Sequence, residues 1–206
     1  MQGMEMELPK VLGLTGSIGT GKSTIAKMFR SLKIPVLDAD KIVHHLYETS
    51  PLLIERLRAY QASLIQDGKV DRHALSHLVV KEPSFLPLLE SIIHPLVKQV
   101  LMEAIESAKR EQIPLLVLEV PLLFEVGLDA LCHFTLVVHT SDALQKERVL
   151  NRAHMTEEQF LKISSRQLPQ QEKINRADFT LDTSRSRVHI FKDLLKYLKK
   201  VCSSHA

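Results

Sequence analysis

The residues from Val11 to Thr24 constrain the fold of this chain more than any other stretch. A short apolar run ends at Gly16, and Gly21-Lys22-Ser23 follows at the spacing G-x-x-x-x-G-K-[ST]. Apolar side chains then recur at the spacing of an amphipathic helix. A strand before this pattern and a helix after it form the context of a phosphate-binding loop. The stretch therefore predicts a site for a nucleoside triphosphate.

Each residue type in this loop has a physical task. Glycines let successive backbone N–H groups turn toward phosphate oxygens, and the following helix adds the positive end of its dipole. Lys22 can reach the β- and γ-phosphates, and the Ser23 hydroxyl can ligate Mg²⁺. The residues expected to bind the triphosphate are Gly16, Ser17, Ile18, Gly19, Thr20, Gly21, Lys22, Ser23 and Thr24.

Length and charge indicate an ordinary globular protein. With 206 residues, 45% of them hydrophobic and 25% charged, residues 1–206 are expected to form a single domain with an insertion. A net charge of +3 is too small to indicate nucleic-acid binding, and no apolar run approaches membrane-spanning length. Cys132 and Cys202 are far apart in the sequence and form no C-x-x-C motif, so we expect two reduced thiols. Met1 to Pro9 lacks the apolar core of a signal peptide. We therefore expect a cytoplasmic protein without nucleic-acid or membrane partners.

Five apolar runs, most of them separated by helical patterns, predict a parallel sheet. The first two are joined by a helix from Lys22 to Leu32 with short connections, which is a right-handed βαβ unit. Further helices are expected from about Asp142, as N-cap, to Arg152 and from Ser186 to Val201. Together they predict a three-layer α/β/α fold around five parallel strands. The predicted strands are Lys10–Leu14, Val36–Leu37, Leu115–Glu119, Phe134–Val138 and Phe179–Leu181.

Between Lys41 and Arg110 the pattern is mostly helical. This region is longer than a crossover helix needs to be, so residues about 41–110 are interpreted as a helical insertion, the usual place for acceptor binding in nucleotide kinases. Breaks in the helical pattern are expected at Thr49-Ser50-Pro51, Asp67-Gly68, Glu82-Pro83 and His94-Pro95.

Among proteins with a phosphate loop, a small-molecule kinase fits best. A GTPase would carry an N-K-x-D motif, which is absent, and the strand Leu115–Glu119 ends in Glu where a motor-type ATPase usually has Asp. Phosphoryl transfer to a hydroxyl needs a group that orients or deprotonates the acceptor and cations that meet the γ-phosphate charge.

Asp40 is the candidate for the first role. Asp38 and Asp40 follow the second predicted strand, and the carboxyl ends of parallel strands share one cleft with the phosphate loop. The alternative for Asp40 is an N-cap of the next helix, although Asp38 could serve as that cap instead.

Arg148 and Arg152 are the candidates for the cationic role. They lie four residues apart, hence on one face of the predicted helix, after the fourth strand, where a lid can close over phosphates. The alternative is a solvated basic helix face.

Taken together, these motifs resemble the dephospho-coenzyme A kinase family from about Val11 to Asp182. The aspartate pair, the P-L-L-F-E stretch and the late A-D, in this order, are more specific than the phosphate loop. Besides that loop, the resemblance rests on Asp38-Ala39-Asp40, Gly68-Lys69-Val70-Asp71-Arg72, Ile93-His94-Pro95, Val120-Pro121-Leu122-Leu123-Phe124-Glu125, Gln145 with Arg148 and Arg152, Gln167, Glu172-Lys173 and Ala177-Asp178.

The resemblance implies a Mg²⁺-dependent enzyme with two small-molecule substrates, ATP and dephospho-coenzyme A. It would phosphorylate the ribose 3′-hydroxyl of dephospho-coenzyme A, giving coenzyme A and ADP in the last step of coenzyme A biosynthesis. Asp40 aligns with the family's catalytic aspartate, and Arg148 aligns with an arginine that contacts the transferring phosphate. Together, Lys22 and Arg148 would stabilise the phosphoryl group during transfer.

The resemblance also implies an acceptor site and a lid. Thr15, Leu122 and Leu123, together with Asp40, fall where the family lines its acceptor site. Residues about 152–168, including Arg152, correspond to its lid. Two other hypotheses stay open on the sequence: a kinase for another small acceptor, and a non-catalytic protein that uses ATP as a switch.

Overall fold

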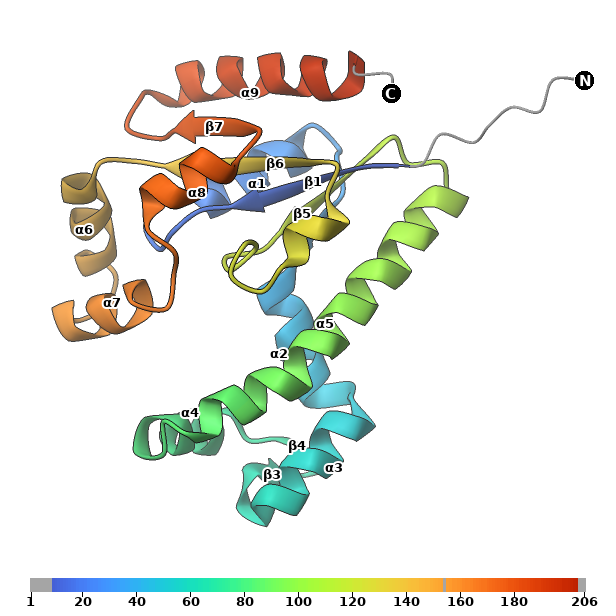
Figure 1. Cartoon of the computed structure of the whole chain (residues 1–206), viewed down its shortest axis with the longest axis vertical. Coiled ribbons are helices and arrows are strands. Elements are labelled where there is room, and N and C mark those ends of the chain that lie inside the picture. The colour runs from blue at the N-terminus through green and yellow to red at the C-terminus, as the bar shows by residue number, and fades with distance from the viewer. Residues whose placement is uncertain (1–8, 154, 204–206) are drawn as a thin grey trace, which may run out of the picture. The chain divides into compact units, whose positions relative to one another are not determined.

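The computed structural model, which describes residues 9–153 and 155–203, divides the chain into two compact units (Figure 1). The first, here called the sheet unit, consists of Met1–Leu37 and Ala104–Ala206, and the second, the helical unit, is Asp38–Glu103. The predicted absence of a signal peptide concerns Met1 to Pro9, which lies outside the described residues except for Pro9.

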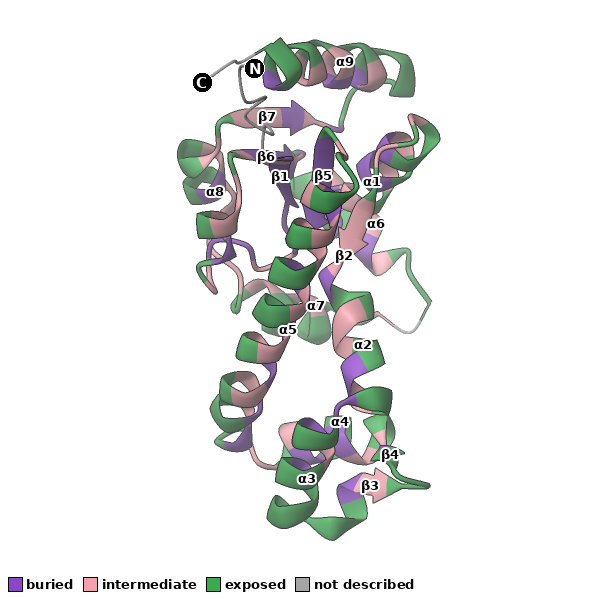
Figure 2. Cartoon of the chain, turned by 90° about the vertical axis from the view of Figure 1, so that its right-hand side faces the viewer, coloured by how far each residue is buried: buried purple, intermediate pink, exposed green. Residues whose placement is uncertain are grey.

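The sheet unit is built on five parallel strands in the order β2-β5-β1-β6-β7, which confirms the predicted sheet. β1 lies at its centre, with Leu12 opposite Val117 of β5 and Gly13 opposite Thr135 of β6. Figure 2 shows β1 and β5 buried along nearly their whole length, as expected for strands covered on both faces. The strands are β1 Lys10–Thr15, β2 Val36–Asp38, β5 Leu115–Glu119, β6 Phe134–His139 and β7 Phe179–Asp182.

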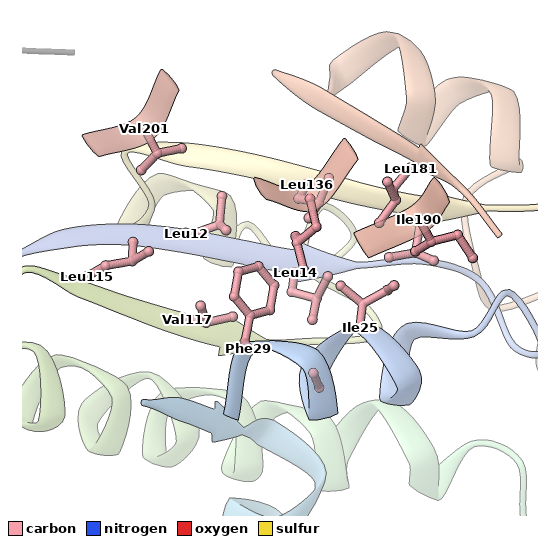
Figure 3. Packing of buried hydrophobic residues seen from close by; sticks show 13 residues of the cluster. Leu12, Leu14, Ile25, Phe29, Leu115, Val117, Leu136, Leu181, Ile190 and Val201 are labelled. Atoms are coloured by element: carbon pink, nitrogen blue, oxygen red, sulfur yellow. The ribbon is translucent and has the colours of Figure 1, made fainter. Parts of the chain in front are cut away.

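Helices cover this sheet because their apolar stripes pack against the strands. Leu12 and Leu14 of β1 share one core cluster with Phe29 of α1 and Ile190 of α9 (Figure 3). On the other face, Gly13 leaves room for Leu123, since a Cβ there would fall 2.7 Å from Leu123 Cδ2. The helices of this unit are α1 Lys22–Ser31, η2 Leu128–Leu131, α6 Asp142–Leu150, α7 Glu157–Ser164, α8 Gln170–Arg176 and α9 Arg187–Ser203.

Two details of α6 differ from the prediction. Its N-cap is Ser141, whose hydroxyl accepts from Leu144 N, rather than Asp142. The helix ends at Leu150, and Arg152 N donates to Val149 O in the tighter turn that follows. The expectation that Arg148 and Arg152 share one helix face is therefore wrong, because the chain leaves the helix between them.

Three helices of the helical unit begin at a side-chain cap. Asp38, Ser50 and Asp71 are the N-caps of α2, α3 and α4. A hairpin between α3 and α4, with positive φ at Asp67 and Gly68, went unrecognised in the sequence although Asp-Gly is a strong hairpin signal. The elements are α2 Ala39–Thr49, α3 Pro51–Tyr60, η1 Ala62–Leu64, β3 Ile65–Gln66, β4 Lys69–Val70, α4 Arg72–Lys81 and α5 Phe85–Arg110, of which the residues from Ala104 onward belong to the sheet unit.

The prediction of a break at His94-Pro95 is wrong, because α5 continues through Pro95. Proline removes one helical hydrogen bond, but the buried stripe of this helix keeps its spacing on both sides of it, from Leu89 and Ile93 to Val97 and Leu101. By length and composition alone, α5 could also cross a membrane, whereas the sequence predicted no apolar run of that length. Core helices of soluble proteins can have the same length and composition, so one such helix is weak evidence for a membrane span.

Candidate active site

The phosphate loop runs from the end of β1 to the start of α1 and is shaped by its glycines and its own hydrogen bonds. Gly21 is the N-cap of α1 with φ 93° and ψ 14°, a left-handed conformation that other residues rarely adopt. At Gly19, with φ 80°, a Cβ would fall 2.5 Å from Val149 Cγ2 and 2.9 Å from Gln145 O. Thr20 donates to Ser17 O from both N and Oγ1, at 3.3 and 2.8 Å. The loop is thus a closed turn that lies against α6.

Lys22 is fixed by Glu119, the last residue of β5. Its Nζ lies 3.2 Å from Glu119 Oε1, and Arg30 Nη2 lies 3.4 Å from Oε2 of the same carboxylate. Glu119 is 4% exposed, so this charge is buried and is compensated by two cations. The sequence signal for this residue is a charged side chain at the end of an otherwise apolar strand.

Arg148 reaches the phosphate loop through Thr183. Its Nη1 donates to Thr183 Oγ1 at 2.9 Å and its Nη2 to Thr183 O at 2.8 Å. Thr183 is buried, and its hydroxyl lies 2.6 Å from Thr20 O and 3.2 Å from His139 O, either of which can take its single proton. The structure therefore places Arg148 beside the loop, through a residue that sequence reasoning did not select.

Two glutamines bind the middle of the loop. Gln145 Nε2 donates to Ile18 O at 2.7 Å, and Gln167 Oε1 accepts from Ile18 N at 3.0 Å. Gln145 lies on α6, and Gln167 follows α7 in the segment predicted as the lid. Both were part of the family resemblance, but neither was predicted as a site residue.

A buried ion pair lies behind the turn that follows β5. Lys173 of α8 is fully buried, and its Nζ lies 2.8 Å from Glu125 Oε1 and 3.0 Å from Pro121 O. Pro121 O also accepts from the buried Thr15 hydroxyl at 3.1 Å, and Glu125 Oε1 accepts from Leu168 N at 2.8 Å. Burial lowers the pKa of Lys173, and the carboxylate of Glu125 opposes that shift. This pair connects the turn after β5, the end of the predicted lid and α8.

The remaining candidates of the sheet unit have different surroundings. Leu123 is fully buried, whereas Leu122 is half-buried in the same turn. Ser23 is exposed in the first turn of α1, and Thr24 beside it is half-buried. Arg152 is exposed in the turn after α6.

In the helical unit the cap is Asp38, not Asp40. Asp38 Oδ1 accepts from Asp40 N at 3.1 Å and from Lys41 N at 3.3 Å. Asp40 lies in the first turn of α2 with an exposed side chain, so its carboxylate is not needed for the cap. Of the two roles left open for this pair, the capping role belongs to Asp38.

A cavity of about 630 Å³ opens beside the loop, between α6, α7 and the turn before α8. Both glutamines that bind Ile18 face it, with Phe160 as its aromatic wall. α7 has a capping box of Thr156 and Gln159 but no buried residue. The cavity lining is Ser17, Asp142, Gln145, Lys146, Phe160, Ser164, Ser165, Gln167, Leu168, Pro169 and Gln170.

Comparison with known proteins gives a consistent result. The family model described as dephospho-CoA kinase matches residues 10–188. A dephospho-CoA kinase of Rhizobium etli is 43% identical over 177 residues, which is 85% of each chain. The crystal structure of TT1252 from Thermus thermophilus is 34% identical, with a TM-score of 0.80 over 94% of this chain and 98% of that one. A dephospho-CoA kinase structure from Campylobacter jejuni is 26% identical, with a TM-score of 0.71 over 93% and 96%.

Proposed function

This chain belongs to the dephospho-CoA kinase family, and from that membership we propose that it transfers the γ-phosphoryl group of ATP to the ribose 3′-hydroxyl of dephospho-coenzyme A. The products are coenzyme A and ADP, and the reaction is the last step of coenzyme A biosynthesis. The observation that carries the proposal is the phosphate loop, around which separate elements hold Lys22 and Arg148 as cations. Phosphoryl transfer needs positioning and charge stabilisation, which this arrangement supplies.

On the donor side, the loop binds the phosphates of ATP. Backbone N–H groups between Gly16 and Thr24 and the N-terminus of α1 contribute partial positive charge, and Lys22 and Arg148 contribute full charges. The two cations stabilise the charge that spreads over the γ-phosphoryl oxygens during transfer. Since Glu119 and Thr183 already hold both side chains, little ordering is left for the moment of reaction.

The residues of the loop fit a magnesium ion that arrives with ATP. Mg²⁺ prefers oxygen ligands, keeps several waters, and is usually held by one or two protein groups together with substrate phosphates. The Ser23 hydroxyl is exposed at the start of α1, and among residues 9–153 and 155–203 no cluster of three or more His, Cys, Asp or Glu offers a complete protein cage. Ser23 would hold the ion, which would neutralise phosphate charge when bound.

On the acceptor side, Asp40 orients and deprotonates the 3′-hydroxyl, and Thr15, Leu122 and Leu123 line the acceptor site. The helical insertion, about 41–110, serves acceptor binding, and residues about 152–168 with Arg152 serve as a lid within a single kinase domain. We assign the enzyme to the cytoplasm, where it acts on small molecules rather than on nucleic acids or membranes. Support for these roles comes from the family match over residues 10–188.

The test of the reaction is an acceptor assay. ADP release is measured with dephospho-coenzyme A, nucleoside monophosphates and shikimate in parallel. We expect turnover with dephospho-coenzyme A alone. Turnover of another acceptor instead would favour a different small-molecule kinase, and tight ATP binding without any acceptor-stimulated ADP formation would favour an ATP-dependent switch.

The test of the general base compares the two aspartates. Asp40→Asn is expected to lower kcat by about 10²-fold or more with a near-normal KM for ATP, because it removes the proton acceptor without changing shape. Asp38→Asn is the matched control, since asparagine caps a helix as well as aspartate does. An unaltered kcat in Asp40→Asn, or an equal loss in both variants, would remove Asp40 from this role.

A further inference from the structure

The two glutamines at Ile18 fix the backbone on both sides of that residue. Gln167 accepts from the N–H of the peptide between Ser17 and Ile18, and Gln145 donates to the carbonyl of the peptide between Ile18 and Gly19. Two adjacent peptide planes, and with them φ and ψ of Ile18, are therefore held by side chains from outside the loop.

Because each peptide group is planar, a hydrogen bond that fixes one of its polar groups also fixes the direction of the other. In a planar trans peptide the N–H and C=O point in opposite directions. The bond to Gln167 thus turns the Ser17 carbonyl away from Gln167, and that carbonyl accepts from Thr20 N and Oγ1. In the same way, the bond to Gln145 turns the Gly19 N–H away from α6. The two glutamines therefore set the directions of the groups from which a phosphate cradle is made.

These two hydrogen bonds lie beside the open cavity at the phosphate loop and not in the hydrophobic core. Both glutamines line the open cavity beside the loop, and Gln145 is 8% exposed. The loop also lies close against α6 at Gly19, where no Cβ would fit. Gln145 lies N-terminal to the predicted lid, residues about 152–168, and Gln167 lies at its C-terminal end, 127 and 149 residues from Ile18 in the chain.

We propose that Gln145 and Gln167 are positioning residues for ATP, which hold the phosphate loop in its anion-binding shape and connect it to α6 and to the C-terminal end of the lid. The inference rests on the proposed kinase function and adds two residues to it. A preorganised loop binds phosphate more tightly because less backbone freedom is lost on binding. The glutamines therefore act on the affinity for ATP and not on that for the acceptor.

The opposite polarity of the two bonds allows a sharp test. Gln145 is the donor in its bond, so Gln145→Glu loses the bond and places a carboxylate against a carbonyl oxygen. Gln167 is the acceptor, so Gln167→Glu keeps its bond. Both variants add one negative charge next to Ile18, so the difference between their Kd values for ATP reports the effect of the hydrogen bond. Gln171→Glu, at an exposed position of α8, is the control for charge. Gln171 Nε2 donates to Asn175 Oδ1, and after the substitution a rotated Asn175 amide can donate to the new carboxylate instead.

The measurements are the Kd of ATP by titration calorimetry without acceptor, and KM and kcat with dephospho-coenzyme A. We expect Gln145→Glu to raise Kd and KM for ATP roughly tenfold above Gln167→Glu, the effect of one unmade buried hydrogen bond, with KM for the acceptor within about twofold of wild type. Gln167→Leu should weaken ATP binding by a similar factor, and Gln167→Glu should restore most of it.

Two outcomes would overturn the inference. Equal weakening in the two glutamate variants would show that charge rather than the bond is responsible. Lower thermal stability with unchanged Kd and KM for ATP would show a purely structural role. Because the calorimetry uses ATP alone, a wild-type protein that binds ATP but does not phosphorylate dephospho-coenzyme A would refute the proposed function while the role of the glutamines in ATP binding is still tested.

Discussion

Replacing Lys173 by methionine should destabilise the protein far more than the loss of an ordinary lysine. Lys173 is fully buried, the side chain of Glu125 is 12% exposed, and the two form an ion pair with 2.8 Å between Nζ and Oε1. Methionine fills a similar volume without a charge. The Glu125 carboxylate would then stay buried with Leu168 N as its remaining donor among the described residues, since its Oε2 has no partner there.

The cost follows from that uncompensated charge. Removing one partner of a buried ion pair typically costs about 3–5 kcal/mol of stability. In a chain of this size each kcal/mol corresponds to roughly 2–4 °C, so the midpoint of thermal unfolding should fall by roughly 6–20 °C. The double variant Lys173→Met/Glu125→Gln leaves no buried charge, and Gln can still accept from Leu168 N, so it should lose only about 1 kcal/mol.

The assay is a double-mutant cycle by thermal and urea unfolding, with Lys146→Met as the control. Lys146 and Glu157 form an exposed ion pair, with side chains 48% and 60% exposed, and such pairs contribute about 0–1 kcal/mol. The reasoning would be refuted by a Lys173→Met variant no less stable than the control, or by a double variant that loses the sum of both single effects.

Three further predictions concern charge and ionisation. Glu119→Gln removes a negative charge beside Lys22, so the Kd of ATP should fall, while kcat falls because a neutral amide holds Lys22 less firmly than the carboxylate does; a Kd that rises would contradict this. Burial raises the pKa of Cys132 to about 12. The folded chain therefore keeps that proton while the unfolded chain releases it, so stability is fully present below the unfolded thiol pKa and declines as pH rises toward about 12. At pH 8 a thiol reagent should modify the exposed Cys202 rapidly and Cys132 only after denaturation, and equal rates in the native protein would exclude this burial effect.

The strands were predictable because their signal is local. Leu115–Glu119 is a continuous apolar run bounded by prolines, and its observed limits are those predicted. The phosphate loop was equally predictable, since the glycine spacing and the following helix are both encoded within one short stretch of sequence. In both cases a residue's neighbours in sequence decide its conformation.

Other features depend on tertiary contacts and leave no local pattern. The helix through Pro95 persists because buried residues on both sides share one stripe, which outweighs the lost hydrogen bond. The contact between Thr183 and Thr20 joins residues 163 apart in the chain, and a threonine in this position has no distinguishing spacing. The early end of α6, which separates Arg152 from Arg148, follows from a turn whose hydrogen bonds become visible only in the structure.

Tertiary contacts outside the motif also explain how a phosphate loop that many families share can serve phosphoryl transfer. A lysine side chain loses up to about 2 kcal/mol of conformational entropy when it is fixed, and a cation stabilises a developing charge best when it does not move during the reaction. Here Glu119 of β5 fixes Lys22, and Thr183 after β7 fixes Arg148 and also contacts the loop at Thr20. The ordering cost of both cations is thus met during folding, by residues outside the motif. Substitutions of these holding residues should therefore affect kcat more than the overall fold, and a phosphate loop without them would bind the same phosphates with less effect on their transfer.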